Sequence, residues 1–200
     1  AVVVSLSLTV YSQDAWSPNE IQSADLARNL ADWSSVEKDV LLHTNLVRLY
    51  PQKYLRLVVE TWEMPKRYTT LNKSTSYYRG LLRELSKMRS THALVPNSRL
   101  RDVALCFAKA QGAAGDTGHN RSGTGCPKVN TVARGWAENC DYGMNSGEDI
   151  VMHLLIDEDV PSLGHRKSIL NPEYFSIGIG HASHARWGSV TVQDFSMQER

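Results

Sequence analysis

The sequence predicts an α+β domain in which helices come first and strands come last. Apolar side chains recur at three- to four-residue intervals through three segments before residue 112, which is typical of helices with one buried face. Near the end, the runs FSIGIG and WGSVTVQDF resemble strands, and a short turn region, HASHAR, joins them. Because helices and strands do not alternate, this order favours an α+β layer structure over a series of βαβ units.

The first predicted helix covers residues 35–50, and Pro51 ends it. A second covers residues 74–88, with Ser74 or Ser76 as its N-cap, and a third begins after Pro96. Their apolar faces are predicted to be core. The positions are Val36, Val40, His43, Val47 and Tyr50 in the first helix, Tyr78, Leu81, Leu82, Leu85 and Met88 in the second, and Leu100, Val103, Ala104, Phe107 and Ala108 in the third.

From Gly112 to Gly147 glycines and polar residues replace the apolar periodicity, which predicts a long structured loop region. A fourth helix opens at Ser146, with Asp149 placed to complete a capping box, and continues through IVMHLLI. The two terminal runs then form an antiparallel hairpin.

The charge balance argues against nucleic acid as a partner. Lys and Arg number 22 and Asp and Glu 21, so the chain lacks the excess of cations that a phosphate backbone requires.

The first ten residues, AVVVSLSLTV, are too few to span a bilayer, which takes roughly 20 apolar residues. We interpret residues 1–13 as the remnant of a secretory signal; the alternative is a β-strand.

The three cysteines leave two interpretations open. Cys106 lies on an apolar helical face, where a thiol behaves as a small buried hydrophobe. Cys126 and Cys140 lie in loop-like segments. In an oxidising compartment a disulfide between them would stabilise the fold by about 3 kcal/mol, because it restricts the unfolded chain. We therefore predict a Cys126–Cys140 disulfide, against the alternative of two free thiols. There is no CxxC pair for a cysteine zinc site.

Two histidines and two glutamates are the candidate functional residues. His119 and His165 each follow a glycine in a polar turn, Glu138 lies in the tripeptide AEN, and Glu148 falls in the first turn of the fourth helix. Two imidazoles with one or two carboxylates could form an open zinc site. The alternative is that the histidines merely bond loop backbones while Glu138 anchors a neighbouring loop. GxSxG, HExxH and phosphate-loop signatures are absent from the sequence.

Several short motifs in order resemble the cysteine-rich secretory, antigen 5 and pathogenesis-related (CAP) family, in its bacterial-type branch. They are LLHTNLVRLYP, with His43, Asn45 and Arg48 as an HNxxR helix, then GHNRSGTGCP, AENCDYG, GHRKSILNP, GIG and VQDF. The resemblance implies an α-β-α sandwich with a small antiparallel sheet over residues 36–200. Residues 1–35 would be an N-terminal extension, and residues 51–93 would carry a helical insertion.

The resemblance also implies a cleft lined by His119, Glu138 and His165, with Glu148 as the fourth member on weaker motif support. In some family members this cleft binds a divalent cation, here through His119 and His165, with zinc as one candidate. We expect an extracellular or periplasmic binding module for a cation or small ligand. The alternative is a metal-dependent hydrolase of peptides or cell-wall polymers, in which Glu138 is the general base. A third hypothesis is an interaction protein that uses the insertion as its contact surface.

Overall fold

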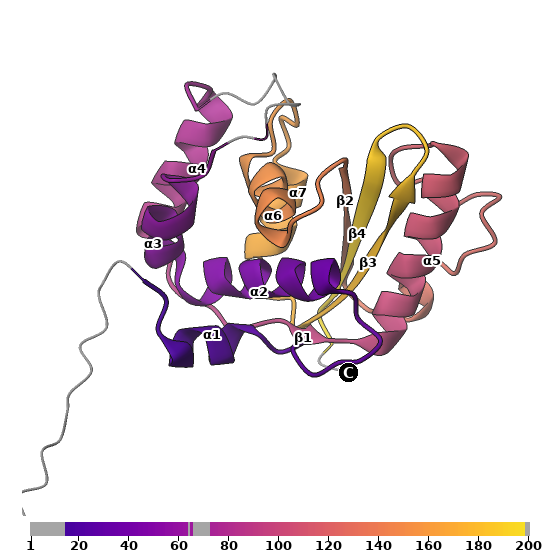
Figure 1. Cartoon of the computed structure of the whole chain (residues 1–200), viewed down its shortest axis with the longest axis horizontal. Helices are drawn as coiled ribbons and strands as arrows, with labels where there is room; N and C mark the ends of the chain where they lie inside the picture. Colours follow the sequence, from indigo (N-terminus) through magenta and orange to yellow (C-terminus); the bar gives the residue numbers. More distant parts are fainter. Residues whose placement is uncertain (1–14, 64, 66–72, 199–200) are drawn as a thin grey trace, which may run out of the picture.

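The computed structural model describes residues 15–63, 65 and 73–198, and it confirms the α+β fold with a sheet between helical layers (Figure 1). Within these residues the sheet has the strand order β1-β3-β4-β2. The strands are β1 (Val95–Pro96), β2 (Trp136–Tyr142), β3 (Ser176–His184) and β4 (Gly188–Ser196). β2, β4 and β3 pair antiparallel, whereas the short β1 runs parallel to β3, so the sheet is mixed rather than wholly antiparallel.

Helices cover both faces of the sheet. They are α1 (Pro18–Ala24), α2 (Ser35–Leu49), α3 (Pro51–Tyr54), the π-helix η1 (Leu55–Val59), α4 (Ser76–Lys87), α5 (Ser98–Ala114), the 3-10 helix η2 (Val129–Thr131), α6 (Gly147–Ile156) and α7 (Gly164–Leu170). In Figure 1, α5 lies on one side of the sheet, α2, α6 and α7 lie on the other, and α3 and α4 pack beyond α6. Among the described helices, none has both the length and the apolar character that a bilayer crossing needs.

The helix boundaries follow local capping signals. Ser34 and Glu37 form a reciprocal capping box at the start of α2. The side chain of Asn97 caps α5, and that of Ser146 caps α6. α4 begins at Ser76 behind Thr75, not behind Ser74 or Ser76 as the cap. These hydrogen bonds join residues three positions apart and need no tertiary partner, so the sequence locates the starts of the four predicted helices, α2, α4, α5 and α6, to within two residues.

Two glycines of the run FSIGIG allow α5 to pack directly on β3. A Cβ atom at Gly178 would lie 2.1 Å from the backbone of Leu100 and Arg101, and one at Gly180 would lie 2.3 Å from the backbone nitrogen of Leu105. Such distances are far below van der Waals contact, so only glycine permits this approach of helix and strand. Between α5 and the sheet the packed core includes Phe107, which is fully buried.

The HNxxR motif ties distant segments to α2. Asn45 donates to the carbonyls of Ala24 and Leu94 and accepts the amide of Leu94. The Arg48 guanidinium, which is fully buried, donates to the carbonyls of Ile169 and Asn171 at 2.8 Å each. Because those carbonyls belong to the C-terminal end of α7, Arg48 fixes the helix whose first turn carries His165.

Residues 15–35 pack against the rest of the domain. α1 starts with a capping box between Ser17 and Glu20, and Ala24, Ala27 and Trp33 lie in the main core with residues of α2 and α6. The helices α3, η1 and α4, within the proposed insertion, also contribute buried side chains to that core. The proposed signal remnant at residues 1–13 lies outside the described residues.

The structure corrects two expectations about the second half of the chain. The segment WAENCDY is not loop but strand β2, hydrogen-bonded to β4 along its whole length. The segment expected to be a turn, HASHAR, largely continues β3 through His184, so that the hairpin turns at residues 185–187. The first correction matters for the site, because β2 carries Glu138.

Candidate functional site

His119 and Glu138 form the base of a cleft at the edge strand β2. Glu138 lies on β2 opposite Asp194 of β4, and His119 lies in the loop that follows α5. The Nδ1 atom of His119 is 2.8 Å from Oε1 of Glu138. The glutamate side chain is 4% exposed and the histidine side chain 55%, so the imidazole projects to solvent from a buried carboxylate.

His165 reaches the same cleft from the first turn of α7. Its ring centroid is 6.4 Å from that of His119, at an interplanar angle of 35°. Its Nδ1 atom lies 2.7 Å from Oδ1 of Asp157, while Oδ2 of Asp157 accepts the backbone N–H of His165. Asp157 itself adopts a left-handed conformation (φ 56°) just after α6. Both cleft histidines are therefore held by carboxylates, not by loop carbonyls.

Arg121 holds the other oxygen of Glu138. Its guanidinium contacts Oε2 of Glu138 and lies 3.1 Å from Oδ2 of Asp194, and it stacks over Phe107 at 4.2 Å from the ring centroid. Burial acts to raise the pKa of Glu138, but the hydrogen bond to His119 and the charge of Arg121 outweigh it and hold that pKa below its usual value. Glu138 is therefore ionised at neutral pH, with both of its oxygens engaged.

The disulfide differs from the predicted one. Cys106 of α5 bonds to Cys126 of the loop, and Cys140 is a free, buried thiol. The predicted Cys126–Cys140 pair is wrong because Cys140 lies on β2 and packs with Ala104, Phe107 and the strand valines. Burial raises the pKa of the Cys140 thiol well above its usual range, with the charges of Glu138 and Asp194 adding to the effect. The bond that does form pins the loop of His119 to α5.

Three side chains of the cleft could hold a metal ion together. Ligand atoms of His119, Glu138 and Cys140 lie within 4.8 Å of one another, and this is the group with that property in the described part of the chain. The Cys140 sulfur is 3.8 Å from Nδ1 of His119 and 3.9 Å from Oε1 of Glu138. The donor set, one imidazole, one carboxylate and one thiol, suits a divalent cation.

Comparison with known proteins identifies the family. The model of the "CAP: Cysteine-rich secretory protein family" matches residues 46–195, three quarters of the chain. This chain belongs to the CAP family. No curated protein matches it significantly. The family match spans His119, Glu138 and His165 and ends just before Ser196, the last residue of β4, so the matched region includes the cleft and all of the sheet except Ser196.

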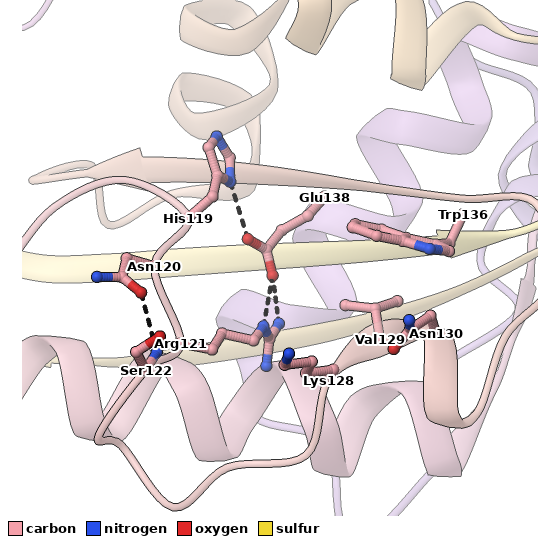
Figure 2. Close-up of a pocket in the computed structure, with 9 residues that line it drawn as sticks. All are labelled: His119, Asn120, Arg121, Ser122, Lys128, Val129, Asn130, Trp136 and Glu138. Carbon is pink, nitrogen blue, oxygen red and sulfur yellow. Dashed lines mark hydrogen bonds and ion pairs between the residues drawn. The ribbon is translucent and has the colours of Figure 1, made fainter.

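A pocket of about 410 Å³ opens beside His119 and Glu138 of the CAP domain (Figure 2). Its other lining residues come from the loop after α5, from η2 and from the start of β2: they are Asn120, Arg121, Ser122, Lys128, Val129, Asn130 and Trp136. Figure 2 shows Trp136 and Glu138 projecting from β2 toward the side on which Lys128 and Asn130 lie. His165 is not among the residues that line this pocket, which extends from His119 and Glu138 along the loop.

Glu148, the fourth predicted member of the cleft, has other neighbours. It lies in the first turn of α6, where burial raises its pKa and the negative charges of Asp149 and Asp39 raise it further. Among the contacts of the described residues, none joins Glu148 to His119, Glu138 or His165. Its membership of the cleft stays a prediction.

Sequence reasoning missed Arg121, Asp157 and Trp136 as components of the cleft. Arg121 could have been predicted as a cleft residue, because it follows His119 by two residues inside the motif GHNRSG. Asp157 acts on a residue eight positions later through a left-handed turn, and no local pattern announces that contact.

Proposed function

We propose that this chain is a secreted CAP domain whose cleft binds a divalent cation between Nε2 of His119 and Nε2 of His165. The observation that carries the proposal is that each ring meets a carboxylate at Nδ1, Glu138 in one case and Asp157 in the other. An ionised carboxylate can only accept a hydrogen bond, so each neutral imidazole must carry its proton on Nδ1. The lone pair of each ring is then on Nε2.

The two lone pairs are available for coordination. In the described part of the chain, no hydrogen bond engages Nε2 of either ring. A carboxylate behind each ligating imidazole is the arrangement that fixes the tautomer and raises the basicity of the metal-binding nitrogen. The carboxylates therefore support a histidine pair as the ligands rather than a set that includes Glu138 itself.

One ion joins the two rings after a small movement. Zinc binds imidazole nitrogen at about 2.0–2.1 Å, and with roughly 1.1 Å from nitrogen to centroid, two rings on one tetrahedral ion lie about 5 Å apart. The observed separation of 6.4 Å is larger, so the rings approach each other by about 1 Å when they bind one ion. Two protein ligands leave the remaining positions to water or a small ligand, so we expect an exchangeable cation rather than a structural one.

The same geometry supports a binding module more than a hydrolase. A general base needs a free oxygen to accept a proton from water, yet one oxygen of Glu138 faces His119 and the other faces Arg121. Its lowered pKa weakens it further as a base.

Export is supported by the Cys106–Cys126 disulfide, because such bonds persist in oxidising compartments and are rare in the cytosol.

Calorimetric zinc titration near neutral pH tests the cation site. We expect binding by the wild type, and a loss of roughly tenfold or more in affinity in both His119→Ala and His165→Ala. Asn120→Ala, a change in the same exposed loop, is the matched control and should bind as the wild type does. The proposal is wrong if the wild type gives no binding, or if both histidine variants retain its affinity.

A further inference from the structure

We propose that the pocket beside the cation site binds an acidic saccharide, with a sugar ring stacked on Trp136 and its carboxylate on Lys128. This proposal deepens the proposed function, because the pocket shares His119 and Glu138 with the cation site, but it does not require the cation. Four properties of the pocket carry it: an exposed aromatic side chain, side-chain amides and a hydroxyl, a positive charge without an opposing charge, and a rigid frame.

The aromatic surface is Trp136, the first residue of β2. Its side chain is 48% exposed, the largest exposure among the large apolar residues in the described part of the chain. An indole exposed on the wall of a pocket offers a flat apolar face of large area and one N–H donor at its edge. A pyranose ring matches that surface, because its axial C–H groups form an apolar face while its hydroxyls point outward.

The remaining walls carry the partners that hydroxyl and amide groups need. Asn120, Asn130 and Ser122 line the pocket with side-chain amides and a hydroxyl. Asn120 uses its oxygen for the backbone N–H of Ser122, which leaves its amide N–H groups for a ligand. A sterol or acyl chain would leave these groups without partners, so the lining favours a polar ligand.

The charges of the pocket favour an acid. Arg121 is neutralised by Glu138 and also contacts Asp194, and both oxygens of Glu138 are engaged. Lys128 is exposed, and within the described residues it has no ion-pair partner. One unopposed positive charge therefore remains on the pocket wall, which a carboxylate on the sugar would meet.

The frame of the pocket is fixed before any ligand arrives. The disulfide ties the loop to α5 at Cys126, and Arg121 donates to the carbonyls of Val103 and Pro127 from beneath it. Val129 of η2 is buried against Leu100 and Val103. A preformed site binds without the entropic cost of ordering a loop. Its volume of about 410 Å³ lies at the small end of the range for ligand pockets, about 300–1,000 Å³.

Calorimetry with three saccharides, in the presence of EDTA, tests the proposal. The acidic probes are trigalacturonic acid and the disaccharide of N-acetylglucosamine and N-acetylmuramic acid, which distinguish a uronate from a lactyl carboxylate. The neutral probe is chitotriose. We expect the wild type to bind at least one acidic probe more tightly than chitotriose, and chelation of metal to leave that affinity unchanged.

Variants assign the contacts. Trp136→Ala should weaken the acidic probe roughly tenfold. Trp187→Ala removes an indole of similar exposure, 43%, at the turn between β3 and β4, and should have no effect. Lys128→Met should weaken the acidic probe about threefold and leave chitotriose unchanged. Absence of saccharide binding at millimolar probe, preference for chitotriose, or equal affinities of the two tryptophan variants would overturn the proposal. Failure of the zinc titration alone would leave it standing.

Discussion

Asp157 holds the imidazole of His165 in place through two of its own oxygens. Its Oδ1 atom lies 2.7 Å from Nδ1 of the ring, and its Oδ2 atom accepts the backbone N–H of the same residue at 3.0 Å. The carboxylate thus fixes both the tautomer of the ring and the first turn of α7. In the cleft, His119 and Glu138 repeat the contact between Nδ1 and a carboxylate. Each of the two histidines, which come from distant segments, therefore has its Nε2 atom available for a ligand.

Asp157→Asn should weaken zinc binding by roughly 10–100-fold, the range found for residues behind a metal ligand. The amide keeps the shape and tolerates the left-handed backbone but loses the charge that makes the ring a strong ligand. Asp159→Asn is the matched control, because Asp159 is exposed and also has a positive φ, 61°. Equal zinc affinities of the two variants in calorimetry would contradict this role of Asp157.

Removal of the Cys106–Cys126 bond should lower the free energy of unfolding by about 3 kcal/mol, given a sequence separation of 20 residues. Urea unfolding of the Cys106→Ala/Cys126→Ala variant measures this loss. Reductant should destabilise the wild type by a similar amount and leave the double variant unchanged. Mass spectrometry of unreduced protein should find Cys140 as the thiol that alkylates once the chain is unfolded; a Cys126–Cys140 peptide would contradict the structure.

Arg121→Met should destabilise the fold by about 3 kcal/mol or more, because it leaves the buried carboxyls of Glu138 and Asp194 without their shared cation. Adding Asp194→Asn should restore part of that loss, since the second buried acid is then gone. Arg134→Met, at an exposed arginine, should change the stability by less than about 0.5 kcal/mol. Urea unfolding of the wild type, Arg121→Met and Arg121→Met/Asp194→Asn measures these changes. If the double variant is no more stable than Arg121→Met, the electrostatic interpretation of this cluster is wrong.

The pair His153 and Asp141 predicts a pH dependence of stability. Nδ1 of His153 lies 2.5 Å from Oδ1 of Asp141; burial lowers the pKa of the imidazole, but the hydrogen bond and charge of Asp141 outweigh it and raise that pKa above 6.5. A raised pKa means that the folded state binds the proton more tightly. This contribution to stability is complete below pH 6.5 and is lost as pH rises through the folded-state pKa.

Urea unfolding across this pH window should therefore show the free energy of unfolding of the wild type falling as pH increases above 6.5. In His153→Gln, which cannot take up the proton, the fall should be smaller. If the free energies of unfolding of the two proteins change in parallel with pH, His153 is not the source of the pH dependence.

The helices α2, α4, α5 and α6 were predictable from sequence because their signals are local, whereas α3 and α7 lack a side-chain cap and were not predicted. Ser34 with Glu37 and Ser146 with Asp149 lie within one turn of the helices they cap, and no distant residue is needed to recognise them. α1 carries the same signal in Ser17, Pro18 and Glu20, so its helix could have been identified by the same rule.

β2 could not be identified in this way. Its residues Glu138, Asn139 and Asp141 are polar, and each is buried by a partner from another segment: Arg121, Gln193 and His153. The strand therefore lacks the alternation of apolar and polar residues that marks a half-buried strand. The disulfide was undetermined for a related reason, because three cysteines permit three pairings and only the position of Cys106 on α5, facing the loop, selects one.

Crystals grown with zinc and measured at the zinc absorption edge test the central claim most directly. We predict an anomalous difference peak at about 2.1 Å from Nε2 of both His119 and His165, with Glu138 and Asp157 on the opposite side of their respective rings. A peak bonded to the Cys140 sulfur, or zinc sites that avoid both histidines, would contradict it.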